Sequence, residues 1–418
     1  MNDYIENYFS DYLCGFRKGH SPQHCLLVMF ENMKKSIDSK GAASALLTDL
    51  SKAFDCLRYD LLIAKLHAYR FSHSSLQLVF DYLSNRKQRV KIDTTFSVWT
   101  EVDTGVPQGS IIGPILFNIF INDIFYFVKE TKITNYADDN TPYKCGTNTE
   151  NILLQLENEG NILINWFTNN YMKANADKCH LLVTSNAENY SINLGGIRID
   201  NSSEVNLLGI LVDNKLKFDK HINTLCKKAS NKLHALIRIS RYMSKEKLRL
   251  LMQAFINSQF GYCPLIWMFH GRQINNRINR IHKRALQTVY NDKTSTFEEL
   301  LIKDNSVQIH HKHLQCLAIE IYKWVHKLSP KIMNNLFQEY SNVYSLRNSR
   351  CMKTENVRTV YYGTETVRFR AWKTWELVPI EIKKSRNLLE FKRCIKSWVP
   401  SGCTCNICKT YIAGVGYL

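Results

Sequence analysis

The segment ITNYADDNTPYK, residues 133–144, decides the fold. Residues 133–137 and 141–144 have the pattern of two short strands, and Asp138 and Asp139 join them. Two strand-like runs on either side of a short polar connection are typical of a β-hairpin. The segment therefore predicts a hairpin that carries two adjacent carboxylates at its tip.

A second strand-like run ends close to another carboxylate. Residues 43–50 form a short, nearly continuous apolar run of the buried-strand type, and Asp49 lies near its end. If this strand neighbours the hairpin in one sheet, Asp49, Asp138 and Asp139 converge at one edge. Phosphoryl transfer to a nucleotide uses two hard cations about 4 Å apart, which prefer carboxylate oxygens. The alternative is that Asp49 caps the next helix and the Asp pair is an ordinary turn.

Helical and strand-like patterns alternate over the first half of the chain. Helices are expected at 25–37, 61–69, 76–83, 111–124 and 150–172, and further strands at 88–92, 181–184, 191–199 and 205–212. Beyond about residue 215 the pattern is nearly all helical, with helices at 220–241, 245–258, 272–289 and 312–328. This order predicts an α+β domain followed by a helical region.

The charge of the chain is unevenly distributed. A length of 418 residues allows two or three packed units, and 45% hydrophobic with 11% aromatic residues excludes a disordered tail. The net charge is +18, but residues 1–212 hold 19 Lys and Arg against 23 Asp and Glu, whereas residues 213–418 hold 36 against 14. The basic second half suggests binding of a polyanion, with a solvated basic surface as the plainer alternative.

Thirteen cysteines are scattered along the chain, most of them singly, and no secretory signal opens it. These features predict a reducing intracellular location, in the nucleus or the cytoplasm. The apolar run 111–127 is interrupted by Asn118, Asn122 and Asp123 well short of a membrane-spanning length. No transmembrane helix and no membrane partner are therefore expected.

Four blocks in a fixed order resemble those of one known family. They are DLSKAFD (49–55), GVPQGS (105–110), YADD (136–139) and LLGI (207–210). These blocks look like those of reverse transcriptases, and most of all those of non-LTR (LINE-type) retrotransposons. FRAWKTWELVP (369–379) and the run 385–398 resemble the carboxy-terminal region of the same elements. The resemblance therefore covers nearly the whole chain.

The resemblance implies a right-hand polymerase that copies RNA into DNA with two magnesium ions. Asp49 and Asp138 would bind both ions, and Asp139 would support the charge of the site. The main-chain carbonyl of Leu50 would add a ligand. The implied partners are an RNA template, a DNA primer and dNTPs.

The same resemblance implies a nucleotide pocket. Phe54 matches the family's bulky gate against a ribose 2′-hydroxyl, with an ordinary core phenylalanine as the alternative. Gln108 and Gly109 would lie against the incoming nucleotide or the template, unless the block is a plain loop before a helix. GFRKGHS (15–21) matches the fingers motif, in which Arg17 would hold the triphosphate.

Two further blocks imply roles near the primer end. Residues 173–179 resemble the block whose lysine protonates pyrophosphate, which would be Lys178, with Lys173 as the competing candidate. Leu208 and Gly209 match the primer grip, a tight hairpin that presses the primer end toward the metals.

Three cysteines cluster near the carboxy-terminus. Cys403, Cys405 and Cys408 are a possible zinc site that would hold RNA. Four ligands are the rule, however, and no fourth Cys or His lies at the usual spacing; Cys394 is the nearest thiol, nine residues upstream. The grouped histidines farther upstream are expected on the surface of a basic helix rather than at a metal: His310, His311 and His313.

The combined expectation is a right hand, with fingers and palm in residues 1–212, a helical thumb in 213–300 and a helical basic tail in 301–418. The family carries more fingers structure before the 15–21 block, so the resemblance implies an amino-terminally truncated polymerase. One rival is an element fragment that binds RNA without catalysis. A host enzyme such as telomerase or an intron-encoded maturase is disfavoured, because neither is expected to carry the 369–398 segment.

Overall fold

The computed structural model describes residues 2–175, 178–184, 189–338, 356–412 and 416–417. The chain divides into two compact units. The first comprises Met1–Cys25 and Gly41–Ser203, and the second comprises Leu26–Lys40 and Glu204–Leu418. The first unit is therefore interrupted in sequence by a helix that belongs to the second.

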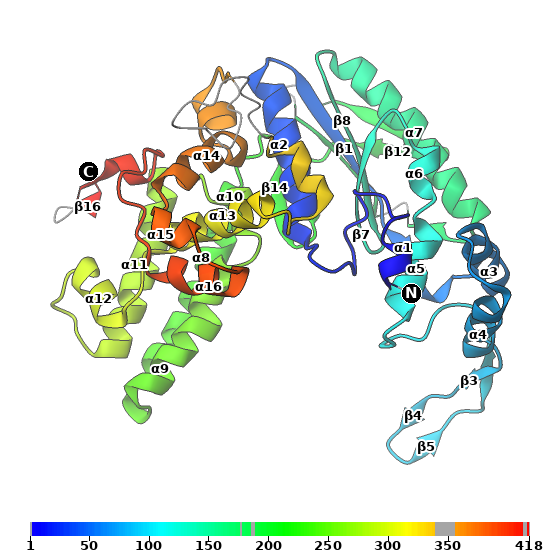
Figure 1. The fold of residues 1–418 in the computed structure, drawn as a ribbon, viewed down its shortest axis with the longest axis horizontal. Helices are drawn as coiled ribbons and strands as arrows, with labels where there is room; N and C mark the ends of the chain where they lie inside the picture. The colour runs from blue at the N-terminus through cyan, green and yellow to red at the C-terminus, as the bar shows by residue number, and fades with distance from the viewer. Residues whose placement is uncertain (1, 176–177, 185–188, 339–355, 413–415, 418) are drawn as a thin grey trace. The chain divides into compact units, whose positions relative to one another are not determined.

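The first unit is built on a four-stranded antiparallel sheet (Figure 1). Its strands follow the order β10 (His180–Val183), β1 (Ala42–Leu47), β8 (Asp139–Gly146) and β7 (Lys132–Tyr136). β7 and β8 form the predicted hairpin, in which Tyr136 pairs with Asp139. β1 pairs with β8, with Ala45 opposite Tyr143. The two strands that carry the predicted carboxylates are thus neighbours.

A long helix covers this sheet. All six residues of β1 are buried, because β8 and β10 flank the strand and α7 (Thr149–Asn169) packs across it (Figure 1). α7 starts at Asn148, whose side chain accepts a hydrogen bond from the amide of Asn151. The helix comes close to the sheet at Gly160, where an added Cβ would lie 2.8 Å from the Leu46 side chain. The helix thereby excludes water from the central strand.

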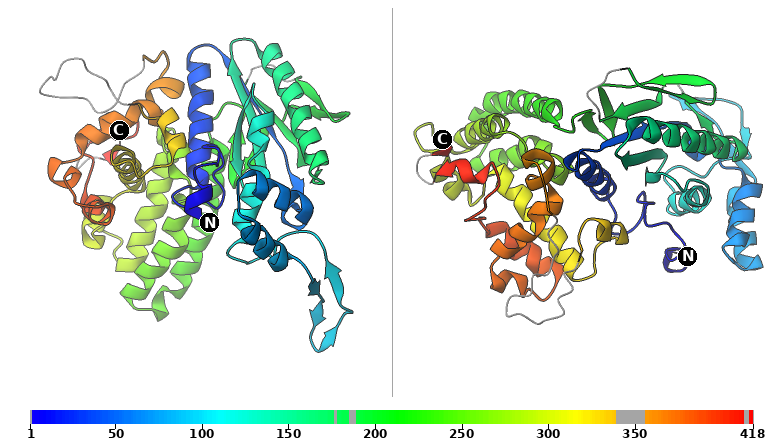
Figure 2. Two further views of the ribbon diagram at one scale, coloured as in Figure 1. Left: turned by 45° about the vertical axis from the view of Figure 1, so that its right-hand side comes forward. Right: turned by 90° about the horizontal axis from the view of Figure 1, so that it is seen from above.

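A second core of the first unit is mainly helical. It lies among α3 (Tyr59–Ala68), α4 (His73–Leu83), α5 (Gly113–Ile121) and α6 (Ile124–Phe127), and Leu62, Leu66 and Phe117 are among its fully buried residues. Between α4 and α5 the chain forms a narrow antiparallel arm of short strands, which extends beyond α4 in Figure 2. The strands of the arm are β3 (Arg86–Gln88), β4 (Lys91–Ile92), β5 (Thr95–Phe96) and β6 (Thr100–Val102).

Three segments expected as single strands are interrupted in the structure. Residues 191–199 lie in the hairpin of β11 (Ser191–Leu194) and β12 (Ile197–Asp200), and residues 205–212 lie in that of β13 (Glu204–Leu207) and β14 (Ile210–Asp213). Residues 88–92 are shared between β3 and β4. Gly195 with Gly196, and Leu208 with Gly209, have positive φ angles and reverse the chain in two-residue turns. Alternating apolar residues continue through such turns, so the pattern alone does not reveal the reversal.

The second unit is mainly helical, as expected. Its helices are α2 (Pro22–Asp38, largely in this unit), α8 (Asp219–Ile239), α9 (Lys245–Leu251), α10 (Pro264–Trp267), α11 (Arg272–Tyr290), α12 (Phe297–Asp304), α13 (Ile309–Val325), α14 (Val367–Leu377), α15 (Ile380–Lys383) and α16 (Leu388–Cys394). The helix expected at 245–258 continues from α9 as a π-helical turn (Met252–Ile256) and a 3₁₀ turn (Asn257–Phe260). None of the described helices has both the length and the apolar character needed to cross a bilayer.

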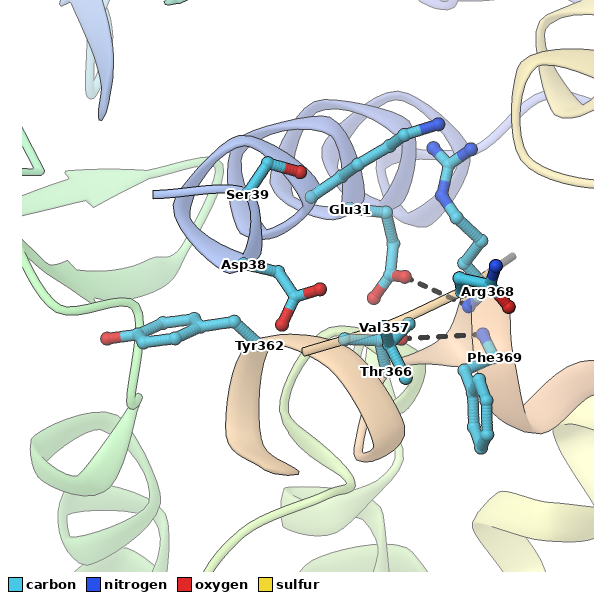
Figure 3. Close-up of a pocket in the computed structure, with 10 residues that line it drawn as sticks. Glu31, Asp38, Ser39, Val357, Tyr362, Thr366, Arg368 and Phe369 are labelled. Atoms are coloured by element: carbon cyan, nitrogen blue, oxygen red, sulfur yellow. Dashed lines mark hydrogen bonds between the residues drawn. The ribbon is translucent and has the colours of Figure 1, made fainter. Parts of the chain in front are cut away.

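Two buried carboxylates of α2 accept hydrogen bonds from main-chain amides in the carboxy-terminal part of the chain (Figure 3). Glu31 accepts hydrogen bonds from the amides of Val367 at 3.2 Å and Arg368 at 2.9 Å, at the start of α14. Asp38 accepts from the amide of Thr359 at 2.7 Å. Burial raises the pKa of Asp38, but hydrogen bonds from residues 358 and 359 outweigh it and lower the pKa overall. Because unpaired amides at a helix start favour anions, Glu31 joins α2 to the start of α14, and Asp38 joins α2 to the start of the π-helical turn at Val360–Thr364.

The expectation that the grouped histidines lie on a basic surface is wrong. His310, His311 and His313 are 1%, 9% and 2% exposed. They lie on α13, which α10, α11, α14 and α16 surround. Burial lowers the pKa of His313 to about 3, and its Nε2 lies 2.8 Å from the carbonyl oxygen of Phe260. A neutral imidazole with such a partner is compatible with a helix that lies inside the unit.

Candidate active site

Asp49 lies directly after the central strand of the sheet. Thr48 forms an antiparallel bridge with Asn140, and its amide and hydroxyl both donate to the Asn140 carbonyl, at 3.1 and 2.8 Å. Because the strands are antiparallel, the residue after Thr48, Asp49, faces the residue before Asn140, Asp139. Facing residues of antiparallel strands have Cα atoms about 5 Å apart. The strand register therefore brings Asp49 to the hairpin that carries the other two carboxylates.

Two buried asparagines fix the hairpin tip. Ala137 turns the chain with a φ of 58°. The side-chain amide of Asn135 donates to the Ala137 carbonyl and to Oδ1 of Asn140, both at 2.9 Å. The side-chain amide of Asn140 in turn donates to the carbonyl of Asp138 at 3.0 Å. The main chain of the tip is thus held from inside the sheet, which defines the position of both aspartates.

The three carboxylates influence one another electrostatically. Burial, followed by the negative charges of Asp138 and Asp49, raises the pKa of Asp139 to about 6. Carboxylates gathered in this way repel each other unless cations bind between them. An all-oxygen donor set is the kind that hard divalent cations such as Mg²⁺ prefer. The residues present therefore fit a divalent-cation site.

Lys178 lies beside the same strand end. Its Nζ is 3.2 Å from Oδ2 of Asp49. The contact follows from the pairing of β2 (Leu50–Ser51) with β9 (Lys173–Ala174), and from a hydrogen bond of 2.8 Å between the amide of Asn175 and the carbonyl of Asp49. Lys173 lies on β9 with an exposed side chain. Of the two candidate lysines, Lys178 is the one that forms an ion pair with Asp49.

Phe54 lies on a short 3₁₀ turn after β2 and is partly buried. Its ring stacks on that of Phe117 at 4.2 Å between centroids and meets the edge of Phe16 at 5.8 Å. One residue later, Asp55 accepts a hydrogen bond of 3.0 Å from the side-chain amide of Gln108. The structure therefore brings Gln108 to the turn that carries Phe54, through Asp55, although the sequence places the two in separate blocks.

The glycines of the GVPQGS block differ in their surroundings. Gly105 has a φ of +75°, and an added Cβ would lie 2.7 Å from the Cα of Asp55. Gly109 has a φ of +80°, and an added Cβ would meet nothing within 4 Å. Gly105 is thus required for packing on the Phe54 turn. Gly109 lies at an open point of the loop, and its contact with a nucleotide stays a prediction.

Arg17 is engaged within the amino-terminal segment. Its guanidinium forms an ion pair with Glu6 at 2.6 Å and donates to the carbonyls of Ser10 and Leu13 at 2.6 and 2.8 Å. Only 6% of its side chain is exposed. Binding of a triphosphate by Arg17 stays a prediction, and it would require an exchange of these partners.

Gly15 has a role at the site that the sequence motif did not reveal. A Cβ at this position would lie 2.3 Å from the amide nitrogen of Ala137, in the aspartate hairpin. The neighbouring Cys14 donates its amide to the carbonyl of Asn135 at 3.1 Å, and Asn118 donates its side-chain amide to the carbonyl of Gly15 at 2.8 Å. The only sequence signal was the glycine itself, at the start of the GFRKGHS block. Gly15, Asn135 and Asn140 are therefore supporting residues found by the structure.

Leu208 and Gly209 belong to the second unit. They form the two-residue turn between β13 and β14, with φ angles of 47° and 80°. The hydroxyl of Tyr262 donates to the carbonyl of Leu208 at 2.7 Å and so holds the turn. The segment is a tight hairpin, as the primer-grip assignment requires, and its contact with a primer stays a prediction.

An antiparallel sheet with one carboxylate after an interior strand and two on the adjacent hairpin offers the kind of oxygen ligands that a two-metal phosphoryl-transfer centre uses. The family model described as "Reverse transcriptase (RNA-dependent DNA polymerase)" matches residues 1–212, which is half of the chain. The chain belongs to this family.

Several relatives are polymerases of mobile elements. The chain is 25% identical over 293 residues to the "Probable RNA-directed DNA polymerase from transposon BS" of Drosophila melanogaster, which covers 67% of this chain and 32% of that protein. It is 28% identical over 224 residues to the "RNA-directed DNA polymerase from mobile element jockey" of the same species, and the match covers 50% of this chain and 24% of that protein. The chain thus spans about a third or less of the length of these relatives.

Similarity to solved structures is more distant. Apo telomerase from Candida tropicalis aligns with a TM-score of 0.42 and 11% identity, covering 79% of this chain and 58% of that one. Telomerase from Candida albicans, in complex with a fragment of telomeric RNA, aligns with a TM-score of 0.36 and 14% identity, covering 78% and 55%.

Proposed function

We propose that the first unit contains a polymerase centre of a non-LTR retrotransposon, which extends a DNA primer along an RNA template. The primer 3′-oxygen attacks the α-phosphorus of a dNTP, the bond to the leaving pyrophosphate breaks, and the primer grows by one nucleotide. The observation that carries the proposal is the convergence of Asp49, Asp138 and Asp139 in one strand register. The mobile-element relatives support the choice of RNA as template.

Two magnesium ions would be held by Asp49 and Asp138, and the carbonyl of Leu50 would add a ligand. When bound, the ions would activate the 3′-hydroxyl and neutralise the triphosphate. Asp139 would balance the positive charge of the ions from the adjacent position on the hairpin. This role is supported by the partly buried position of Asp139 beside the other two carboxylates, because a bound cation would offset both the burial and the repulsion that raise its pKa.

The residues around the carboxylates would position the nucleotide. Lys178, beside Asp49, would protonate the leaving pyrophosphate. Phe54 would exclude a ribose 2′-hydroxyl, because its ring is held by the stack on Phe117 and cannot easily move aside. Gln108 would contact the base pair from its position against the Phe54 turn.

The second unit would bind the nucleic acid. Its share of the chain carries most of the basic excess, and Lys and Arg displace counterions from phosphates. The Leu208–Gly209 turn would contact the primer end. An intracellular location, in the nucleus or the cytoplasm, is part of the proposal, because most of the thirteen cysteines stand singly in the sequence.

A primer-extension assay tests the proposal. The purified full chain is given a primed RNA template with dNTPs and Mg²⁺, beside the variants Asp138→Ala and Asp49→Asn. We expect extension by the unchanged chain and a loss of at least about 10³-fold in either variant, because each removes a charge that holds the ions. RNA binding, measured by fluorescence anisotropy, should change little.

Asp81→Asn is the matched control, because Asp81 is exposed on α4, and its carboxylate accepts a hydrogen bond of 2.9 Å from the side-chain amide of Gln77 on the same helix. This variant should extend the primer at the rate of the unchanged chain. Tight RNA binding without extension by any of the four proteins would reject catalysis and would favour the rival function, an RNA-binding fragment of a mobile element.

A further inference from the structure

A histidine and two cysteines from distant parts of the second unit meet at one point. Nε2 of His310, on α13, lies 3.3 Å from Sγ of Cys405, which is 95 residues away in sequence. Together with Sγ of Cys408, these atoms all lie within 4.8 Å of one another. His310 and Cys405 are 1% and 0% exposed, so the point of contact is shielded from water.

The spacing of these atoms fits a tetrahedral zinc ion. Zinc–sulfur bonds of about 2.3 Å and zinc–nitrogen bonds of about 2.0 Å place sulfur and nitrogen about 3.5 Å apart, and two sulfurs about 3.8 Å apart. The distance of 3.3 Å between Cys405 and His310 is close to the first value. Without a metal, the same groups would gain only weak hydrogen bonds, because a thiol is a poor donor and a poor acceptor.

Cys403 is the candidate fourth donor on the same short loop. Its thiol is close enough to interact with the thiols of Cys405 and Cys408, but it lies outside the group of three whose ligand atoms are all within 4.8 Å of one another. The amide of Cys408 also donates to Sγ of Cys405 at 3.3 Å, and such a bond stabilises a thiolate. His311 is the competing fourth ligand, because its Nε2 lies 3.9 Å from Sγ of Cys408. Three thiolates and one imidazole form a donor set of structural zinc sites.

The loop is held in this position by α14. Arg370 and Glu365 form a buried ion pair at the start of this helix. Arg370 also donates to the hydroxyl of Thr404 at 3.2 Å, and Glu365 accepts from the amide of Asn406 at 3.3 Å. Both contacts lie between the cysteines in sequence. The loop is therefore arranged by groups that do not take part in the donor set, which is how preformed metal sites are supported.

We propose that one zinc ion is bound here by four ligands: His310, Cys403, Cys405 and Cys408. Four protein ligands leave no open position, so the ion is structural and not catalytic. Binding releases the thiol protons and uses the neutral form of the imidazole. The ion fastens the carboxy-terminal loop to α13, and this role is independent of the carboxylates in the first unit.

Metal content and cobalt substitution of the full chain test the proposal. The protein is purified under reducing conditions without chelators, and its zinc is measured by mass spectrometry. We expect one zinc per chain. Replacement by Co²⁺ should give the intense visible bands and thiolate charge-transfer bands of tetrahedral sulfur-rich coordination. A chain that contains no zinc and shows no such spectrum after Co²⁺ is added overturns the proposal, and this readout needs no variant that could misfold.

Four variants identify the ligands. His310→Gln, Cys403→Ser and Cys405→Ser should each lose zinc, whereas His311→Gln should retain it. If His311→Gln loses zinc while Cys403→Ser retains it, the proposed ligand set is wrong. A chelator should lower the melting temperature of the unchanged chain and expose residues 399–412 to protease, and Zn²⁺ but not Mg²⁺ should reverse both effects. Failure of zinc to restore the loop would contradict its structural role.

Discussion

At the scale of single residues, the Asp139 carboxyl has an unusual acidity. Burial and the charges of Asp138 and Asp49 raise its pKa to about 6. The folded chain therefore keeps a proton on this group at a pH where the unfolded chain, with a carboxyl pKa of about 3.9, has lost it. The resulting contribution to stability is complete below about pH 4 and is lost as the pH rises through about 6. At neutral pH the ionised group destabilises the metal-free fold.

Because ionised Asp139 destabilises the metal-free fold, the variant Asp139→Asn should differ from the unchanged chain in a pH-dependent way. Without divalent cations, the variant should melt at a higher temperature than the unchanged chain at about pH 8, and the difference should vanish near pH 4. Added Mg²⁺ should stabilise the unchanged chain more at about pH 8 than below pH 6, because protons compete for the same oxygens. Thermal unfolding across pH measures both effects. A difference that is independent of pH, or one shared by Asp81→Asn, would contradict the assignment.

At the scale of the elements, the amino-terminal segment and the β7–β8 hairpin determine each other's position. Gly15 lies against the amide of Ala137 at a distance where no side chain fits. Hydrogen bonds from Cys14 and Asn118 hold the segment there. The hairpin tip is thus defined from one side by Asn135 and Asn140 within the sheet, and from the other by a glycine from a separate part of the chain.

Gly15→Ala should therefore disturb catalysis through the hairpin. The new Cβ would lie 2.3 Å from Ala137, so the tip must shift. A displacement of about 1 Å at a reacting centre costs on the order of 10²-fold in rate, and overpacking costs about 1–3 kcal/mol in the free energy of unfolding. Primer extension and thermal unfolding measure the two losses. Gly271→Ala is the control, since an added Cβ there meets nothing within 4 Å; extension should be unchanged, and only a small loss of stability is expected, because Gly271 caps the start of α11 and alanine is a poorer cap. An unaltered extension rate in Gly15→Ala would contradict this coupling.

At the scale of the whole molecule, the candidate catalytic carboxylates and most of the basic residues lie in different halves of the chain. The carboxylates lie in the half of the chain that is slightly acidic, and the basic excess lies in the other. In the second unit, α11 carries exposed arginines at helical spacing, at positions 277, 280 and 284. A row of arginines on one face of a helix is suited to contact successive phosphates.

Replacing Arg277, Arg280 and Arg284 together by glutamine should weaken RNA binding and its dependence on salt. Each lost phosphate contact should reduce the slope of log K against log salt by about 0.7 for a single strand. Anisotropy titrations at several salt concentrations provide the measurement. Lys129→Gln with Lys132→Gln, two exposed lysines of the first unit, serves as the comparison. An equal loss for each charge removed, three in the first protein and two in the second, would show that total charge, and not this helix, governs binding.

The clearest sequence-based predictions were those in which chemistry and local pattern coincide. The two strands, the hairpin and the order of the family blocks follow from apolar runs interrupted by aspartates, and the structure confirms β1 and β8 as neighbours. The predicted surface position of the three grouped histidines was wrong, because helical spacing does not show how many other helices surround a helix. The engagement of Arg17 by Glu6 was also not visible, since it depends on a fold of the amino-terminal segment back on itself.

By itself, the sequence determined the family and the α+β and helical organisation of the two halves. It also identified three aspartates as candidate metal ligands. These inferences depend on residues that are close together along the chain. Only the tertiary structure decided which distant residues meet. Thr48 beside Asn140, Gly15 against Ala137 and His310 beside Cys405 are contacts between segments far apart in sequence, and their positions are set by strand register and helix packing. No periodicity or short motif encodes such contacts, because the free energy that selects them belongs to the packed core as a whole.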